Sequence, residues 1–471
     1  MTPFERVLQN HTFPFQLRSY QVEGVNELAD LPRSGCYDEV GLGKTALATA
    51  VALYQKIVNK SVTIVILPPV LLRQWERWLG CVGGAGRVVR YQGTPAKRKE
   101  MSFENADWVL VSLVIFKNDI ERFNREFEHA AVMVIVDEAT CLKSVSSQNY
   151  RTIRDFSAGR GLLLLTATPL STPIDAFAYC KLLAPKLYRS LGQFESLHVA
   201  ERDFFGNVKA WSNLELLADN MKVNSIRRLA QDVLVHLGSP IYTPMFYDLA
   251  PEHLALYTQL AEDQILLLED GGKIDATQEN RLYHMLQQII CNPGFFAGDD
   301  QYKPAIFDLI DEVVAELDAG NPRSPNKLVI YANYRMTNKA LLQYLAPLGA
   351  VALYSDISDA QKQRNLERFK TDPTCRVFVA QWDSGGVGVD GLQHVCSDAL
   401  FVECPSVPRQ FVQAVGRLFR EGQRRPPTIR IAVAEGTLQN RKHRQLLAAD
   451  QLVNRVQGGF KDLREAIYGG A

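Results

Sequence analysis

The chain has 471 residues, of which 46% are hydrophobic and 22% charged, with 52 basic and 52 acidic side chains. This length predicts two or three domains, and the balanced total charge neither favours nor excludes nucleic acid, because such binding depends on local patches. No uncharged apolar stretch reaches about 18 residues, so we expect no membrane span, and residues 1–6 lack the pattern of a signal peptide. Eight cysteines without a Cys-x-x-Cys pair favour a reducing compartment over a disulfide framework or a zinc site.

Two segments near the N-terminus predict a nucleotide site. Upstream, Gln21 carries an amide that can donate to and accept from an adenine edge. Residues 38–45 read Asp-Glu-Val-Gly-Leu-Gly-Lys-Thr and lead into an alanine-rich run expected to be a helix. Glycines let backbone N–H groups approach phosphates, so Lys44 is expected to reach the β- and γ-phosphates and Thr45 to hold Mg²⁺. Asp38, however, occupies the first glycine position of the usual pattern. When this segment is considered without the other motifs, an ordinary glycine turn before a helix therefore remains the alternative.

Short apolar and β-branched runs alternate with helical patterns in two blocks, which predicts parallel strands buried on both faces. Ligand sites are then expected at the carboxyl ends of the strands. The segment from Ala184 to about Pro240 is expected to be mostly helical, and two loops are expected at 269–273 and 321–325. We place the first domain at 1–240 and the second at 241–471. The predicted strands are 62–67, 108–113, 132–137 and 161–168 in the first block, and 327–332, 351–354, 376–381, 398–404 and 428–434 in the second.

Polar residues follow two of the predicted strands of the first block. Asp137 and Glu138 come directly after an apolar run. Asp137 is expected to hold Mg²⁺ and Glu138 to polarise an attacking water, with a solvated strand end as the alternative. Thr166-Ala167-Thr168 follows the next strand, where hydroxyls can respond to the state of the γ-phosphate.

The second block ends in an arginine pair. Arg417 and Arg420 lie within Gln413–Gln423 and are expected to share one face of a helix. Two guanidiniums directed across a cleft can neutralise charge on a transferred phosphoryl group, whereas a solvated helix surface is the alternative. Found together in this order, the phosphate loop, the acidic pair, the Thr-Ala-Thr turn and the arginine pair favour a nucleotide hydrolase over these separate alternatives.

These motifs make the chain similar to helicase superfamily two and, within it, to the Swi/Snf-related DNA translocases. Residues 38–45 resemble the family's phosphate loop, 137–144 its D-E-A-H-x-L-K-N motif and 413–423 its Q-A-x-G-R-x-x-R-x-G-Q motif. Thr140 stands where the family has a histidine that couples hydrolysis to DNA contacts. The large insertions and histone-binding modules of chromatin enzymes are not seen, which makes a compact bacterial or phage-like member the expectation. Shorter segments also resemble motifs of this family: 67–69 together with Gln74-Trp75, Arg227-Arg228, 384–389 and 435–437.

The resemblance implies two tandem recombinase-like (P-loop) parallel-sheet domains with a helical segment between them. It also implies ATP and Mg²⁺ as cofactors and duplex or branched DNA as partner. Catalytic roles fall on Lys44, Asp137, Glu138, Gln413, Arg417 and Arg420, with Thr45 and Asp137 at the metal. Nucleotide contacts fall on Arg18, Gln21, Gly41, Leu42, Gly43, Lys44, Thr45 and Gly388. Contacts to DNA, mainly to its phosphates, are expected at Gln74, Ser112, Thr166, Asn333, Ser384, Gly385 and Gly386.

Three functions are compatible with these residues. The leading hypothesis is an ATP-dependent double-stranded DNA translocase that remodels or reanneals DNA or DNA–protein structures. The first alternative is a strand-separating DNA or RNA helicase acting on forks or junctions, which would need a pin-like hairpin. The second is an ATP-gated DNA-binding scaffold, against which the intact Lys44, Asp137 and Glu138 argue. We expect the cytoplasm of a bacterial or phage-infected cell, or the nucleus in a eukaryote, and neither a membrane nor a zinc ion as partner.

Overall fold

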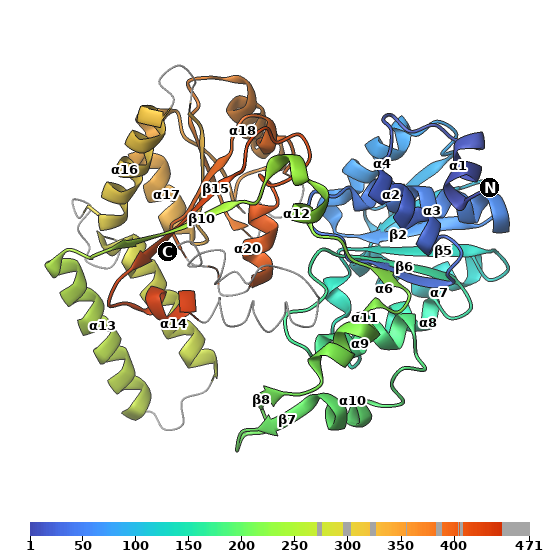
Figure 1. Ribbon diagram of the computed structural model, residues 1–471, viewed down its shortest axis with the longest axis horizontal. Helices are drawn as coiled ribbons and strands as arrows, with labels where there is room; N and C mark the ends of the chain where they lie inside the picture. The colour runs from blue at the N-terminus through green and yellow to red at the C-terminus, as the bar shows by residue number, and fades with distance from the viewer. Residues whose placement is uncertain are drawn as a thin grey trace. The chain divides into compact units, whose positions relative to one another are not determined.

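The computed structural model describes residues 1–270, 276–294, 303–320, 326–354, 356–382, 389–403, 405 and 408–444 (Figure 1). These residues form two compact units, the first of which is Met1–Val233, while the second begins at Leu234. The functional domain limits given above, 1–240 and 241–471, stay a prediction.

The first unit is built on a seven-stranded sheet in which all neighbouring strands are parallel. Its strands are mostly continuous apolar runs, as expected for a sheet covered on both faces. In order across the sheet they are β3 (Val88–Tyr91), β4 (Trp108–Ser112), β2 (Val62–Leu67), β5 (Val132–Asp137), β6 (Gly161–Leu165), β1 (Arg33–Cys36) and β9 (Ser225–Ile226).

Helices cover both faces of this sheet. Successive strand residues point to opposite sides, so continuous apolar strands expose apolar side chains on both faces, and the helices bury them. Val65 and Ile135 pack into one apolar cluster with the first set of helices, while Ile64 and Val134 pack into the other cluster with the second set. The first set is α1 (Pro3–Asn10), α2 (Ser19–Leu28), α3 (Lys44–Asn59) and α4 (Leu72–Cys81). The second set is α6 (Leu113–Asn118), α7 (Ile120–Glu126), α8 (Gln148–Phe156), α9 (Asp175–Leu183), α10 (Leu191–His198) and α11 (Leu214–Lys222). Two shorter helices are α5 (Pro95–Lys99) and α12 (Ala230–Val233).

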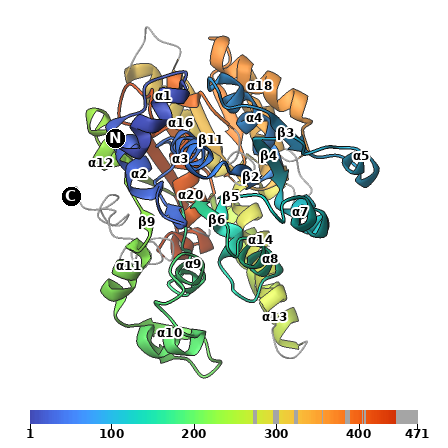
Figure 2. The ribbon, with the colours of Figure 1, turned by 90° about the vertical axis from the view of Figure 1, so that its right-hand side faces the viewer.

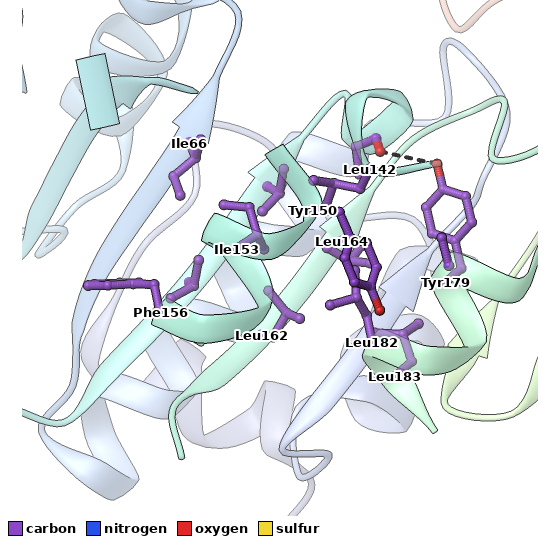
Figure 3. Close-up of a cluster of buried hydrophobic side chains, with 14 of the residues drawn as sticks. Ile66, Leu142, Tyr150, Ile153, Phe156, Leu162, Leu164, Tyr179, Leu182 and Leu183 are labelled. Atoms are coloured by element: carbon purple, nitrogen blue, oxygen red, sulfur yellow. Dashed lines mark hydrogen bonds between the residues drawn. The ribbon is translucent and has the colours of Figure 1, made fainter. Parts of the chain in front are cut away.

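The apolar cluster that contains Ile64 and Val134 connects the second set of helices to the residues that follow β5 (Figure 3). Ile153 and Phe156 of α8 pack with Leu162 and Leu164 of β6 in this cluster. The buried hydroxyl of Tyr179 on α9 donates to the carbonyl oxygen of Ala139 at 3.1 Å. This bond fixes the start of the short 3₁₀ turn η2 (Ala139–Leu142), directly after the predicted acidic pair.

The second unit contains a six-stranded sheet whose pairings are also all parallel. One of its apolar clusters is mostly aliphatic, with Leu328, Val379 and Leu400 packed together with residues of α16 (Ala305–Gly320) and α17 (Arg335–Tyr344). The strand order is β10 (Ile241–Tyr247), β15 (Thr428–Ala434), β14 (Asp398–Phe401), β11 (Leu328–Tyr331), β13 (Val377–Ala380) and β12 (Val351–Leu353). The helices are α13 (Pro251–Asp270), α14 (Ala276–Cys291), α16 (Ala305–Gly320), α17 (Arg335–Tyr344), α18 (Asp359–Thr371) and α20 (Pro408–Val415).

These two α/β units confirm the predicted fold class, and each predicted strand range contains a strand. The prediction that 184–240 is mostly helical is wrong in part, because β7 (Val199–Arg202) and β8 (Val208–Trp211) form an antiparallel hairpin there. Figures 1 and 2 both show α10 beyond α9, away from the sheet of its unit, and Figure 1 shows the hairpin beside α10. The predicted loop at 269–270 is also wrong because α13 continues through Asp270. Residues 271–273 and 321–325 lie outside the described part of the chain.

The helices in the described part of the chain include no candidate for a membrane span. Each of them is either too short or too polar to cross a lipid bilayer.

Candidate active site

The candidate site of the first unit lies where β1, β5 and β6 end. Leu165, the last residue of β6, pairs with Cys36 of β1 on one side and with Asp137 of β5 on the other. Because the strands are parallel, the residues that follow them leave the same edge of the sheet. The phosphate loop, the acidic pair and the Thr-Ala-Thr turn therefore begin side by side.

The phosphate loop depends on two glycines with left-handed backbone conformations. Gly41 has φ 88° and Gly43 has φ 73°, and α3 begins directly afterwards at Lys44. A Cβ atom at Gly43 would lie 2.3 Å from Nε2 of Gln21, so this position has no room for a side chain. The loop thus exposes the start of a long helix, where backbone N–H groups favour an anion.

Gln21 is buried against this loop. Its Nε2 donates to the carbonyl oxygen of Leu42 at 3.1 Å, and its Oε1 accepts from the Arg18 N–H at 2.9 Å. The Tyr20 hydroxyl donates to the same Leu42 carbonyl at 3.2 Å. Gln21 therefore positions the loop, and a contact with adenine would have to replace one of its present bonds.

Lys44 is held by the loop that it belongs to. Its Nζ donates to the carbonyl oxygens of Asp38 at 2.7 Å and Glu39 at 3.0 Å. These neutral acceptors are weaker partners for an ammonium group than phosphate oxygens. The contact therefore fits a lysine that exchanges carbonyls for the phosphates of a bound nucleotide.

The acidic pair follows β5, as predicted. Asp137 accepts from Nε1 of Trp75 at 2.8 Å and from the Glu138 N–H at 3.0 Å, which fixes both carboxylate oxygens. Burial raises the pKa of Asp137, the neighbouring Glu138 carboxylate raises it further, and Lys44 opposes the rise. Glu138 itself has a left-handed backbone with φ 54°, a conformation that is uncommon outside glycine and is often found at functional sites.

These groups fit Mg²⁺ and a nucleoside triphosphate. An oriented carboxylate whose charge is disfavoured by burial and by a second carboxylate is stabilised by a cation. Asp137 and the half-buried Thr45 at the start of α3 would hold Mg²⁺, which when bound would withdraw charge from the phosphates.

The Thr-Ala-Thr turn reaches the same edge of the sheet. The fully buried Thr166 Oγ1 accepts from the Thr168 N–H at 3.1 Å, which does not fit the predicted contact between this side chain and DNA. The buried Thr168 hydroxyl has no hydrogen-bond partner among the described residues. The Thr168 hydroxyl, although buried, is thus not engaged by the described residues, in contrast to that of Thr166.

The arginine pair of the second unit is not on a helix, and that prediction is wrong. α20 ends at Val415, and a turn follows in which the Arg417 N–H donates to the Ala414 carbonyl, three residues back, at 3.1 Å. Arg417 Nη1 donates to the Val389 carbonyl at 3.3 Å, and Arg420 Nη1 lies 3.2 Å from Oδ1 of Asp390. Although burial opposes it, Arg420 helps to hold the pKa of Asp390 below its ordinary value.

The other predicted residues are distributed over both units. Gln413 is half-buried on α20, and Gln74 is exposed on α4. The buried Ser112 hydroxyl caps α6 by accepting from the Ile115 N–H at 3.4 Å. Asn333 follows β11 in the second unit. Ser384, Gly385, Gly386 and Gly388 lie outside the described residues.

Sequence reasoning missed the role of Trp75. It is almost fully buried, as a core residue should be, yet its indole N–H orients Asp137. The only signal was its place beside Gln74 in a motif of the family. It also missed that the Asp38 carboxylate pairs with Arg228 and that the Glu39 carboxylate accepts from the Ala230 N–H.

Two family models match the chain. The SNF2-related domain matches residues 20–295, and the helicase conserved C-terminal domain matches residues 307–422. The first match alone spans more than half of the chain. The chain belongs to the SNF2-related family.

Individual relatives of this SNF2-related chain are distant. TATA-binding protein-associated factor BTAF1 of Arabidopsis thaliana is 23% identical over 90% of this chain and 24% of that protein. Chromodomain-helicase-DNA-binding protein 1-like of Mus musculus is 24% identical over 94% of this chain and 50% of that protein. The chain thus spans half or less of these two relatives. A Sulfolobus solfataricus SWI2/SNF2 ATPase core in complex with dsDNA is 20% identical, with TM-score 0.44 and coverage of 98% of this chain and 99% of that chain.

Glu403 gives the second unit a buried carboxyl that titrates near neutral pH. It accepts hydrogen bonds from the backbone N–H groups of Asn333 and Tyr334, and so orders the loop after β11. Burial raises its pKa from 4.5 to about 7, and the two N–H groups oppose the rise. Because the folded state keeps this proton longer than the unfolded state, stability falls as pH rises through this interval and is then constant.

We expect Glu403→Gln to remove this pH dependence. The wild type should lose on the order of 3 kcal/mol of unfolding free energy between about pH 4.5 and 7 because of this group. Urea denaturation of the second unit, followed at several pH values, measures the difference between wild type and variant. The exposed Glu435→Gln is the control. A variant whose stability changes with pH as steeply as the wild type would contradict the prediction.

Proposed function

We propose that this chain is an ATP-dependent translocase on double-stranded DNA. The observation that carries the proposal is the convergence of Lys44, Asp137 and Glu138 at one edge of a parallel sheet, next to a glycine loop that opens a helix. Family membership supports the same reaction class. In this proposal Lys44 binds the β- and γ-phosphates, Asp137 and Thr45 hold Mg²⁺, and Glu138 takes the proton of the attacking water.

We propose that residues of the second unit complete the reaction. Arg420 already makes an ion pair with Asp390, and Arg417 donates to a backbone carbonyl, so both guanidiniums are held in place. A guanidinium that exchanges such a partner for a phosphate oxygen stabilises charge in the transition state. We propose the predicted catalytic role for Gln413 and the predicted nucleotide contact for Gly388, which lies outside the described residues.

The DNA part of the proposal rests on the family. One relative is named as a DNA-binding protein, and one similar structure contains dsDNA. Sequence-independent contacts to phosphates are proposed at Gln74, Asn333 and 384–386, since polar side chains and backbone N–H groups suit them. The buried Ser112 hydroxyl already caps α6, so, like Thr166, it does not fit the predicted contact. The two relatives whose sequences are compared above are from Arabidopsis thaliana and Mus musculus, so the bacterial or phage setting stays a prediction. The consequence of Thr140 also stays a prediction.

Duplex or branched DNA should raise the ATPase rate more than single-stranded DNA or RNA. Because the contacts are mainly to phosphates, duplex affinity should fall steeply with salt, on the order of a hundredfold or more over the physiological range, and depend little on base sequence. An ATPase assay with a panel of nucleic acids at several salt concentrations measures both. Stimulation by RNA with none by duplex DNA would contradict the proposal.

The alternative of strand separation is favoured by one observation, the β7–β8 hairpin. At its tip, Phe204 and Phe205 are 96% and 84% exposed, with ring centroids 5.6 Å apart. Asp203 orders the turn, since its Oδ1 accepts from the N–H groups of Phe205 at 3.0 Å and Asn207 at 2.8 Å. The base of the hairpin is anchored by the buried His198, whose Nε2 lies 2.8 Å from the Tyr188 hydroxyl. Exposed rings on an ordered turn can stack on bases.

If the hairpin acts as a pin, Phe204→Ser with Phe205→Ser should lower unwinding of a forked duplex at least tenfold. The DNA-stimulated ATPase rate should stay within about twofold of the wild type, because the tip is remote in the fold from the nucleotide loop. Leu216→Ser, at another exposed leucine of the unit, is the control. Equal unwinding by wild type and double variant, or no unwinding by the wild type, would reject strand separation by this hairpin.

A further inference from the structure

We propose that Asp38 and Glu39 are positioning residues. They couple the binding of a nucleotide by Lys44 to the contacts of residues 227–233, which we call the exit segment. The exit segment is the last part of the first unit, and the second unit begins at Leu234. This inference rests on the proposed function and adds to it a route by which the nucleotide state reaches the connection between the units.

The side chains of Asp38 and Glu39 bind the exit segment directly. Oδ2 of Asp38 lies 3.3 Å from Nη1 of Arg228. Oε2 of Glu39 accepts from the Ala230 N–H at 2.8 Å, and the Glu39 N–H donates to the Arg228 carbonyl at 3.0 Å. Both acidic side chains are almost fully buried. The phosphate loop and the exit segment, far apart in sequence, are thus joined by an ion pair and two hydrogen bonds.

The position of Arg228 is defined by its surroundings. Its guanidinium lies over Gly24 of α2, where an added Cβ would come within 2.9 Å of Nη1. Next to it, Nη1 of Arg227 donates to the carbonyl oxygens of Tyr37 at 3.1 Å and Ala167 at 3.3 Å. The exit segment therefore contacts the start of the phosphate loop and the Thr-Ala-Thr turn together.

The backbone of the same two acidic residues holds Lys44. Its ammonium group can leave the carbonyls of Asp38 and Glu39 for phosphates only by breaking both bonds. The two carbonyls then lose their shared partner, while the Glu39 N–H, which belongs to the same peptide group as the Asp38 carbonyl, still donates to the Arg228 carbonyl. Because the side chains of Asp38 and Glu39 hold Arg228 and Ala230, a rotation of their peptide groups changes the ion pair and the hydrogen bonds to the exit segment.

This coupling also explains why an aspartate occupies the first glycine position of the phosphate-loop pattern. A glycine could not pair with Arg228. The other carboxylate oxygen of Asp38 accepts no hydrogen bond from the described residues, so Arg228 is its principal countercharge. Removing Arg228 would leave a buried charge without this partner, which is costly, so the test needs the neutral variant Asp38→Asn as well.

The test compares Asp38→Asn, Arg228→Ala, Arg228→Lys and the double variant Asp38→Asn with Arg228→Ala. Amide hydrogen exchange of 228–233 is measured with and without the non-hydrolysable analogue AMP-PNP and Mg²⁺. Analogue affinity and kcat with saturating duplex DNA are measured in parallel. Arg154→Ala, on the exposed surface of α8, is the control.

We expect the analogue to change exchange of the Ala230 amide at least threefold in the wild type and the control, but not in Asp38→Asn. Arg228→Ala and Asp38→Asn should lower kcat at least tenfold while analogue affinity stays within about threefold. Arg228→Lys should recover part of kcat, and the double variant should be no slower than the slower single variant.

Unchanged exchange in the wild type at saturating analogue would overturn the coupling, even if ATP turnover is normal. A wild type that shows the exchange change but no DNA-stimulated turnover would instead contradict the proposed function and leave the coupling supported. Equal losses of kcat and affinity, with no recovery in Arg228→Lys, would mean that these residues only stabilise the fold.

Discussion

The parallel pairing of β6 with both β1 and β5 is the constraint on which the candidate site depends. Leu165 is in register with Cys36 on one side and Asp137 on the other, so three chain segments leave the sheet at one level. Antiparallel pairing would send one of them to the opposite edge. The glycine loop, the acidic pair and the Thr-Ala-Thr turn owe their proximity to this register, and the apolar clusters on both faces hold the register in place.

Hydrogen bonds and one ion pair of charged side chains then organise the edge of the sheet. The ammonium group of Lys44 is held by carbonyls, the guanidinium of Arg228 by Asp38, and the carboxylate of Asp137 by an indole and a backbone N–H. Each contact satisfies a polar group in a buried setting, where an unpaired charge would be costly. The contacts of Lys44 are also ones that phosphate oxygens can replace. The loop is therefore ordered before a nucleotide binds and can change its partners when one arrives.

The sequence predicted those parts of the fold that depend on local periodicity and on motifs. Val62–Leu67, Val132–Asp137 and Thr428–Ala434 are strands with the predicted limits, because continuous apolar runs have few alternatives in a buried parallel sheet. β10 was not predicted, since its alternating exposure and Pro244 hide a strand that its partner β15 stabilises. The helix predicted for Arg417 and Arg420 ends early because the chain turns after Val415. The contacts of Trp75, Asp38 and Glu39 join residues distant in sequence, which periodicity cannot reveal.

The most direct test of ATP hydrolysis at this edge is to measure Mg²⁺–ATP binding and turnover by Glu138→Gln and Lys44→Ala with duplex DNA present. Glu138→Gln should bind ATP within about threefold of the wild type yet turn it over more slowly by on the order of a hundredfold or more, because the carboxylate acts on the attacking water. Lys44→Ala should lose both binding and turnover, and the exposed Glu128→Gln should behave as wild type. Wild-type turnover in Glu138→Gln would contradict the assignment of the active site.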